Sequence, residues 1–239
     1  MMKYLIIVLA AVIIYAAFSY LKIAYYARHS PNPSIVQSDQ NFGTGGALRY
    51  IAAGDSTAVG EGASSVEHTY TYKVAEKLSE NSAVAYRNVG VRGAKTQDVL
   101  DKQLAQIINF NPDIVTISIG ANDTTHLVSS EQIYQNYQEI IKRLTTETKA
   151  KIYITDVPSF AGAQLLPYVA IAVLENKSAK LNPKLLALEN DRVKIIDIHN
   201  FGWDKFPDRS VTYSLDYFHP SDVGYENWTD AFLSKILQQ

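Results

Sequence analysis

A serine, a histidine and an aspartate in separate short clusters are the residues of this 239-residue chain best suited to do chemistry. Ser56 closes a Gly-Asp-Ser tripeptide that follows a short apolar run, and His219 lies three residues after Asp216. A serine hydroxyl becomes a nucleophile when a neutral imidazole takes its proton, and the imidazole needs an acceptor on its other nitrogen. We therefore interpret Ser56 as a nucleophile, His219 as its base and Asp216 as the acid that orients the histidine.

Two further clusters offer hydrogen-bond donors for a developing negative charge on oxygen. Gly93 follows an asparagine by five residues, and Asn122 lies in a Gly-Ala-Asn-Asp sequence. A backbone N–H beside a glycine and an asparagine amide can both stabilise an oxyanion. Gly93, Asn122 and the N–H of Ser56 are therefore the candidate oxyanion hole. Asp55 and Asp123 are expected to act as hydrogen-bonding supports, because the mechanism needs only one acid.

The four clusters fall where predicted strands end. Short apolar and β-branched runs predict strands at residues 48–53, 83–89, 114–119, 151–155 and 193–198. Amphipathic stretches predict helices at 70–78, 97–108, 131–148, much of 165–188, and 222–237. Strands that alternate with helices predict a parallel sheet covered on both faces. Ligands bind at the carboxyl ends of such strands, so we expect the clusters to meet at one edge of the sheet.

In this order the clusters resemble four sequence blocks of the SGNH or GDSL hydrolases. The matching stretches are residues 54–56, 88–96, 120–123 and 216–220. The resemblance implies an α/β fold, a three-layer α/β/α sandwich with a five-stranded parallel sheet of flavodoxin-like order 2-1-3-4-5. It also implies serine ester hydrolysis without a cofactor.

The same resemblance carries the family's functional residues to this chain. It places the nucleophile on Ser56, the oxyanion groups on Gly93 and Asn122, and the acid and base on Asp216 and His219. The chain departs from the family pattern where Thr57 replaces a common leucine and where Ala94-Lys95 replaces an acidic residue that often follows the oxyanion glycine. Neither departure removes a catalytic group, but both change the shape and charge expected of the pocket.

Composition excludes several other classes of protein. The 22 basic and 24 acidic residues are scattered, which argues against a nucleic-acid partner. The absence of cysteine excludes disulfides, thiolate metal sites and a cysteine nucleophile, and no set of histidines and carboxylates at ligand spacing predicts a metal. Ala58 breaks the Gly-x-Ser-x-Gly signature of ordinary α/β-hydrolases. The remaining histidines are interpreted as surface or loop residues, with His126 nearest the pocket; they are His29, His68, His126 and His199.

The amino-terminal segment differs from the rest of the chain. Residues 1–28 hold an apolar run from 4 to 21 that is long enough to cross a bilayer and predicts a transmembrane anchor. A cleaved signal peptide is the alternative. Residues 29–46 predict a linker, and residues 47–239 the hydrolase domain. We expect a membrane-anchored protein with an extracytoplasmic catalytic domain, or a secreted one after signal cleavage.

The expected activity is a serine esterase that cleaves carboxylic esters through an acyl-enzyme. The anchor and the apolar stretch at 161–174 favour lipid-like esters such as lysophospholipids. That stretch is either a helix packed on the sheet or a mobile wall for an acyl chain. The alternatives are a carbohydrate O-acetylesterase or acyltransferase acting on envelope polysaccharide and, from another class, a non-catalytic binding module. No protein partner is inferred.

Overall fold

The computed structural model describes residues 2–29, 39–44, 47–201 and 209–238. The strands are β1 (Gln40–Phe42), β2 (Ala47–Gly54), β3 (Ala83–Asn88), β4 (Ile114–Ser118), β5 (Lys151–Thr155) and β6 (Val193–Ile196). The α-helices are α1 (Met2–His29), α2 (Ser56–Val59), α3 (Tyr70–Ser79), α4 (Thr96–Asp98), α5 (Leu104–Phe110), α6 (Ala121–Thr125), α7 (Ser130–Glu147), α8 (Tyr168–Leu186) and α9 (Asp222–Ile236). Short 3-10 turns at Val66–His68 and Arg209–Thr212 and a π-helical turn at Val99–Gln103 complete the described elements.

The sheet has the strand order β1-β3-β2-β4-β5-β6. Strands β2 to β6 are all parallel to their neighbours, and their order is the predicted 2-1-3-4-5 when the five are numbered along the chain. The prediction of a purely parallel, five-stranded sheet is wrong, because β1 adds a sixth, antiparallel strand beside β3. The sheet is therefore mixed.

Strand β1 lies within residues 29–46, where the sequence predicted a linker. Gln40 is paired with Tyr86, and the pairing continues through the three residues of the strand. Three residues are too few to carry the alternation that marks a strand in sequence, so the pattern gave no signal here. The rest of the predicted linker includes residues 30–38 and 45–46, which lie outside the described residues.

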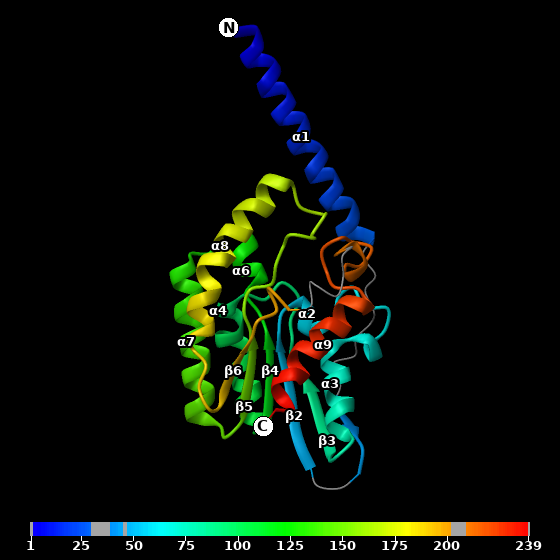
Figure 1. Ribbon diagram of the computed structural model, residues 1–239, viewed down its shortest axis with the longest axis vertical. Coiled ribbons are helices and arrows are strands. Elements are labelled where there is room, and N and C mark those ends of the chain that lie inside the picture. Colours follow the sequence, from blue (N-terminus) through cyan, green and yellow to red (C-terminus); the bar gives the residue numbers. More distant parts are fainter. Residues whose placement is uncertain (1, 30–38, 45–46, 202–208, 239) are drawn as a thin grey trace.

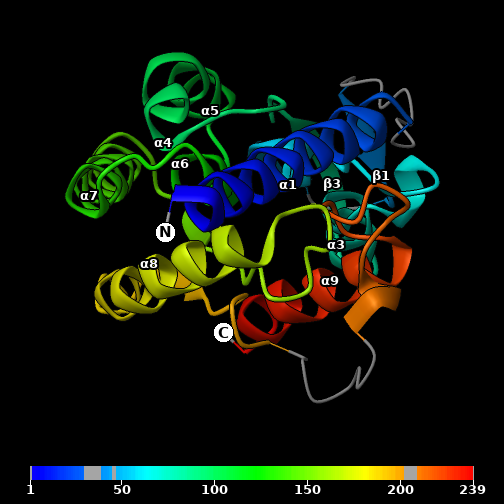
Figure 2. The same cartoon turned by 90° about the horizontal axis from the view of Figure 1, so that it is seen from above.

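Side chains of successive residues on each strand point to opposite faces of the sheet, and each face has its own core. On β2, Ile51 and Ala53 join the core that α5, α7 and α8 cover. Tyr50 and Ala52 join the core that α3 and α9 cover. Figures 1 and 2 show these two sets of helices on either side of the sheet. Because both faces of β2 are buried, the strand is apolar at every position from Tyr50 to Ala53.

Two of the predicted helices differ from the observed ones. The helix predicted at 97–108 is interrupted by the π-helical turn Val99–Gln103, after which α5 continues to Phe110. The helix predicted within 165–188 begins at Tyr168, because the preceding Pro167 has an extended conformation. The residues before Pro167 instead form turns beside the carboxyl end of the sheet. That segment becomes part of the site described below.

Helix α7 begins at Ser130, one residue before the predicted start at 131, and Ser129 caps it. The Ser129 hydroxyl accepts a hydrogen bond from the Gln132 N–H at 3.1 Å. The Gln132 side chain donates a hydrogen bond to the Asn136 side chain, one turn further along the helix. The Ser129 hydroxyl thus accepts a hydrogen bond from an N–H in the first turn of the helix, which has no carbonyl partner within the helix.

Helix α1 extends away from the domain (Figure 1). Its segment Lys3–Tyr26 has a mean hydropathy of 2.4 and is not buried against the rest of the chain. A helix of this length and composition serves either as a membrane anchor or as a signal sequence.

Tyr137 on α7 gives the first testable prediction. Its buried hydroxyl lies 2.9 Å from the Ile119 carbonyl oxygen and 3.0 Å from that of Thr155, so it links the ends of β4 and β5. Tyr137→Phe leaves these carbonyls without that partner and is expected to lower the free energy of unfolding by about 1–3 kcal/mol. Denaturant unfolding measures this. Tyr134→Phe on the same helix is the control, with an expected change below about 0.5 kcal/mol; equal effects of the two would refute the role of the hydroxyl.

Candidate active site

A pocket lies at the carboxyl ends of β2, β4 and β5 and contains the candidate nucleophile. Most of the side chains around it are apolar and come from the segments that follow β5 and precede α9. The lining residues are Asp55, Ser56, Thr57, Ala121, Asn122, Pro158, Ser159, Phe160, Ala163, Ile198, Thr212, Tyr213, Phe218, His219, Pro220, Gly224, Asn227 and Trp228. The pocket therefore combines an apolar wall with a small polar group at one end.

Ser56 lies two residues after the end of β2, where the backbone of Gly54 packs closely against that of Ser118 on β4. At Gly54 the φ angle is +127°, and a Cβ there would lie 1.9 Å from the Ser118 carbonyl oxygen, so only glycine fits. Gln103 completes the hydrogen bonding of Gly54, accepting from its N–H at 2.8 Å and donating to its carbonyl at 2.9 Å. Ser56 is then the first residue of α2 and is only 7% exposed.

Asp55 caps α2 and holds the turn on which Ser56 lies. Its carboxylate accepts hydrogen bonds from the Thr57 N–H at 2.9 Å and the Thr57 hydroxyl at 2.7 Å. Burial raises the pKa of Asp55 to about 6, against the opposing effect of the bonds from Thr57. The Thr57 hydroxyl also hydrogen-bonds with Ser118 on β4. Thr57, where the chain departs from the family pattern, thus ties the capping aspartate to the neighbouring strand.

Asp216 and His219 face Ser56 from a short loop before α9. One Asp216 oxygen accepts from the Phe218 and His219 N–H groups at 2.8 and 2.9 Å. The other lies 2.5 Å from His219 Nδ1, and His219 Nε2 lies 3.0 Å from Ser56 Oγ. Tyr217 between them has a left-handed φ of +59°. The tight turn therefore puts the acid, imidazole and hydroxyl in hydrogen-bonding order.

The electrostatics of this row favour a charged imidazole. Burial alone would raise the pKa of Asp216, but its bonds with His219 outweigh burial and hold that pKa well below its usual range. Burial alone would lower the pKa of His219, but the hydrogen bond with Asp216, and the charges of Asp216, Glu61 and Asp55, together raise it. An imidazole that has taken a proton from Ser56 would be stabilised by the same charges.

Asn122 and Gly93, two of the candidate oxyanion donors, have different positions relative to the pocket. Asn122 lines the pocket, and its amide donates to the Ala94 carbonyl at 3.1 Å. Gly93, next to Ala94, is an exposed loop residue with φ +72° and is not among the described residues that line the pocket. Asp123 supports this loop by accepting from the Thr96 N–H and hydroxyl at 2.9 and 2.6 Å. Asn122 and Ser56 therefore line the same pocket. Gly93 is linked to Asn122 through the hydrogen bond that the Asn122 amide donates to Ala94, the residue after Gly93.

Glu61 is a site residue that sequence reasoning missed. One carboxylate oxygen lies 3.9 Å from His219 Nε2 and 3.3 Å from Arg92 Nε. Arg92 immediately precedes Gly93, so the pair connects the loop of the oxyanion candidate to the vicinity of the imidazole. No spacing rule pointed to Glu61, since the contact depends on the turn after α2.

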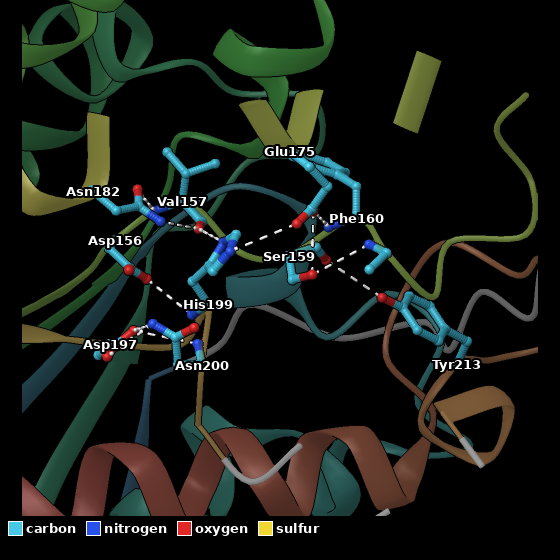
Figure 3. Close-up of polar contacts among 11 residues, drawn as sticks. Asp156, Val157, Ser159, Phe160, Glu175, Asn182, Asp197, His199, Asn200 and Tyr213 are labelled. Carbon is cyan, nitrogen blue, oxygen red and sulfur yellow. Dashed lines mark hydrogen bonds and ion pairs between the residues drawn. The ribbon is translucent and has the colours of Figure 1, made fainter. Parts of the chain in front are cut away.

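The apolar wall after β5 is held by polar side chains of two other segments (Figure 3). The Glu175 carboxylate on α8 accepts from the Ser159 hydroxyl and the Phe160 N–H. His199 lies beside it, with Nε2 3.6 Å from Glu175 and Nδ1 3.2 Å from the Val157 carbonyl oxygen. The interpretation of His199 as a surface or loop residue is therefore incomplete, because it supports the pocket wall from behind.

His68 and His126 lie outside the pocket that contains Ser56. His68 is exposed and pairs with Asp222 at 2.7 Å. His126, predicted to be nearest the pocket, is exposed outside it and hydrogen-bonds through Nδ1 with the Asn122 carbonyl at 2.8 Å. Within the described residues, no three histidine, aspartate or glutamate side chains gather as they would around a metal ion.

Fold and site together define a class, a three-layer α/β/α protein with serine, histidine and aspartate in hydrogen-bonding order at the carboxyl edge of the sheet. Residues 52–226 match the model of the GDSL-like Lipase/Acylhydrolase family. The chain belongs to this family, and membership implies an ester-hydrolysing enzyme. Its sequence matches no curated protein.

Solved structures share this fold at low sequence identity. A lipolytic G-D-S-L family protein from Veillonella parvula has a TM-score of 0.65 at 16% identity, covering 80% of this chain and 100% of its own. A lipase/acylhydrolase from Enterococcus faecalis has a TM-score of 0.59 at 20% identity, covering 79% and 95%. An acetylxylan esterase from Geobacillus stearothermophilus has a TM-score of 0.57 at 16% identity, covering 80% and 95%.

The contact between Glu61 and His219 gives a prediction on protonation. Glu61→Gln removes a negative charge that helps raise the pKa of His219, so that pKa is expected to fall and more of the imidazole to be neutral at pH 7. Titration of isotope-labelled histidine rings by NMR measures the shift. Glu67→Gln, an exposed carboxylate on a nearby turn, is the control. An unchanged or higher pKa in the Glu61 variant would contradict the electrostatic account.

Proposed function

We propose that this protein is a serine hydrolase that cleaves carboxylic acyl esters through an acyl-enzyme on Ser56. The observation that carries the proposal is the hydrogen-bonded row in which His219 Nε2 lies 3.0 Å from Ser56 Oγ and His219 Nδ1 lies 2.5 Å from Asp216. This row meets the two needs of a serine nucleophile, a base on its hydroxyl and an acceptor on the far nitrogen of that base.

The proposed reaction has two halves. Ser56 Oγ attacks the ester carbonyl carbon while His219 takes the hydroxyl proton, and the carbonyl oxygen becomes an oxyanion. The Ser56 N–H, the Gly93 N–H and the Asn122 amide are the proposed donors to that oxyanion. The alcohol then leaves with the proton from His219, and the acyl group stays on Ser56. Water gives a proton to the same imidazole as its oxygen attacks the acyl carbonyl carbon. The bond to Ser56 Oγ then breaks, His219 returns the proton to Ser56, and the acid leaves.

We propose a lipid-like acyl ester, such as a lysophospholipid, as the substrate. The apolar wall formed by Phe160, Ala163 and Phe218 supports this choice, because it offers an acyl chain a surface that excludes water. A carbohydrate O-acetylester is the second candidate, favoured by the acetylxylan esterase among the similar structures. Transfer of the acyl group to a sugar hydroxyl needs only a different acceptor in the second half. A binding module would leave all these esters intact.

We propose that α1 remains as a membrane anchor and that the domain lies on the extracytoplasmic side. The support is the apolar segment Lys3–Tyr26, which exceeds the usual apolar core of a signal peptide. The substrate then meets the enzyme at the membrane surface. Neither a nucleic acid nor a protein partner is part of the proposal.

Ser56→Ala tests the nucleophile. The full-length variant is expected to lose hydrolysis of p-nitrophenyl esters from acetate to palmitate by at least about a thousandfold, since removal of a nucleophile leaves only binding and oxyanion stabilisation. Ser64→Ala, which removes a serine bonded to Asp222 outside the pocket, is the control. Activity retained by the Ser56 variant would overturn the mechanism. Among wild-type rates, a preference for acetate over longer chains would favour the O-acetylesterase.

Asn122→Ala tests the oxyanion donor. The amide lines the pocket beside Ser56, so its loss is expected to lower kcat by roughly 100- to 1,000-fold. KM should change little, because the charge on the oxygen develops only in the transition state. Steady-state kinetics on a soluble ester measure both constants. A kcat near the wild-type value would remove Asn122 from the proposed oxyanion hole.

A further inference from the structure

Exposed apolar side chains of the domain gather at the end that holds the pocket. Outside α1, eight large apolar side chains among the described residues are exposed, and seven of them lie on segments that follow the carboxyl ends of strands. These seven are Val91, Leu127, Tyr168, Val169, Val173, Val211 and Leu215. Leu237, near the carboxyl terminus, is the exception. Single exposed apolar residues need no explanation, but a collection at one end marks an interaction surface.

The first turns of α8 are the most apolar part of this end. Tyr168, Val169 and Val173 are 81%, 69% and 52% exposed. The helix carries no acidic residue in its first turn, and its first charged residue, Glu175, turns inward to Ser159 and Phe160. A helix start that faced water would normally carry polar or acidic side chains. This one presents valines and a tyrosine instead.

The base of α1 lies against the rim of the pocket. The Lys22 ammonium donates to the Gln164 carbonyl, one residue after the pocket residue Ala163. The Tyr26 ring packs edge-on against the Tyr217 ring, with centroids 5.0 Å apart. Tyr217 lies between the acid and the base of the site. Where α1 leaves a bilayer, the pocket rim is therefore at the bilayer surface.

The apolar turns of α8 lie at the same height as part of α1. Figure 1 shows the amino-terminal end of α8 rising to the level of the lower turns of α1, and Figure 2 shows both at this end of the domain. Those turns of α1 belong to the apolar segment Lys3–Tyr26. The lipid that covers the lower turns of α1 thus reaches the start of α8.

We propose that the exposed side chains of the first two turns of α8, within residues 168–173, insert into the lipid surface that α1 crosses and hold the pocket mouth there. The proposal rests on the proposed function only in taking α1 as an anchor. If the proposed function holds, the ester enters the pocket directly from the leaflet and brings its carbonyl beside Ser56. Tyr168 suits this position, since an aromatic ring with a hydroxyl prefers the boundary between headgroups and acyl chains.

The environment of α8 can be measured directly because the chain contains no cysteine. Full-length Val169→Cys carries an NBD fluorophore in vesicles of phosphatidylcholine and phosphatidylglycerol. Lys184→Cys, at the exposed far end of the same helix, is the matched control. The label at 169 is expected to shift to shorter wavelength, to be quenched by doxyl lipids and to resist dithionite. The label at 184 should show none of these effects.

Two outcomes would overturn the insertion. A label at 169 that matches the one at 184 would mean that α8 faces water. A label at 169 that is protected from dithionite but not quenched by doxyl lipids would mean that protein, such as a second copy of the chain, covers the helix. Because these readings need no catalysis, they stand even if the chain hydrolyses no ester.

Activity provides the second arm of the experiment. Val169→Asp places a charge in the lipid contact and is expected to reduce hydrolysis of vesicle-borne lysophosphatidylcholine roughly tenfold, the loss of one buried side chain from the contact. Hydrolysis of soluble p-nitrophenyl acetate should stay within about twofold, because an exposed side chain outside the pocket changes little. Equal loss on both substrates would contradict insertion. A wild type inactive on both would refute the proposed function and leave the fluorescence result to decide the docking.

Discussion

The proposed chemistry depends on one hydrogen bond between residues far apart in the chain. Ser56 and His219 are separated by 163 positions, yet Oγ and Nε2 lie 3.0 Å apart. Two separately built turns must present them to each other, and a displacement of an ångström on either side would break the contact. Much of the polar hydrogen bonding at the carboxyl edge of the sheet can be understood as holding one of these two turns.

On the serine side, the constraint starts in the sheet. The close approach of Gly54 to Ser118 brings β2 and β4 together, and Asp55 then starts α2 at Ser56. The Asp55 carboxyl is buried in this position, and burial disfavours its charged form and raises its pKa to about 6. On the histidine side, four hydrogen bonds to Asp216 fold the loop onto itself, one of them from the Ser214 hydroxyl.

The order of the five parallel strands and the meeting of Ser56, Asp216, His219 and Asn122 could be predicted from sequence. The strand order follows from the resemblance to the GDSL hydrolases. The meeting of the four side chains follows from short polar clusters after apolar runs and from the rule that carboxyl ends of parallel strands share an edge. Strand β1 could not be predicted, because three residues carry no period and the strand forms only where β3 offers a free edge. The same limit applies to the position of Gly93, which lies on an exposed loop whose path no local pattern determines.

No sequence pattern indicated that the acidic side chains of Glu61 and Glu175 contact the site. Glu61 comes near His219 because of the turn that ends α2, and Glu175 on α8 supports the pocket wall at Ser159 and Phe160, 16 and 15 residues earlier in the chain. Acidic residues of this kind have no distinguishing neighbours along the chain. Burial and tertiary contact alone separate them from the many acidic residues that face water.

Covalent capture of Ser56 shows whether its hydroxyl is activated by His219. The full-length protein is treated with a fluorophosphonate, which phosphonylates an activated serine, and the adduct is mapped by peptide mass spectrometry. We expect one adduct, on Ser56, and expect it to form slowly or not at all when His219→Ala removes the base. An adduct on another serine, or none under conditions where known serine hydrolases react, would contradict this expectation.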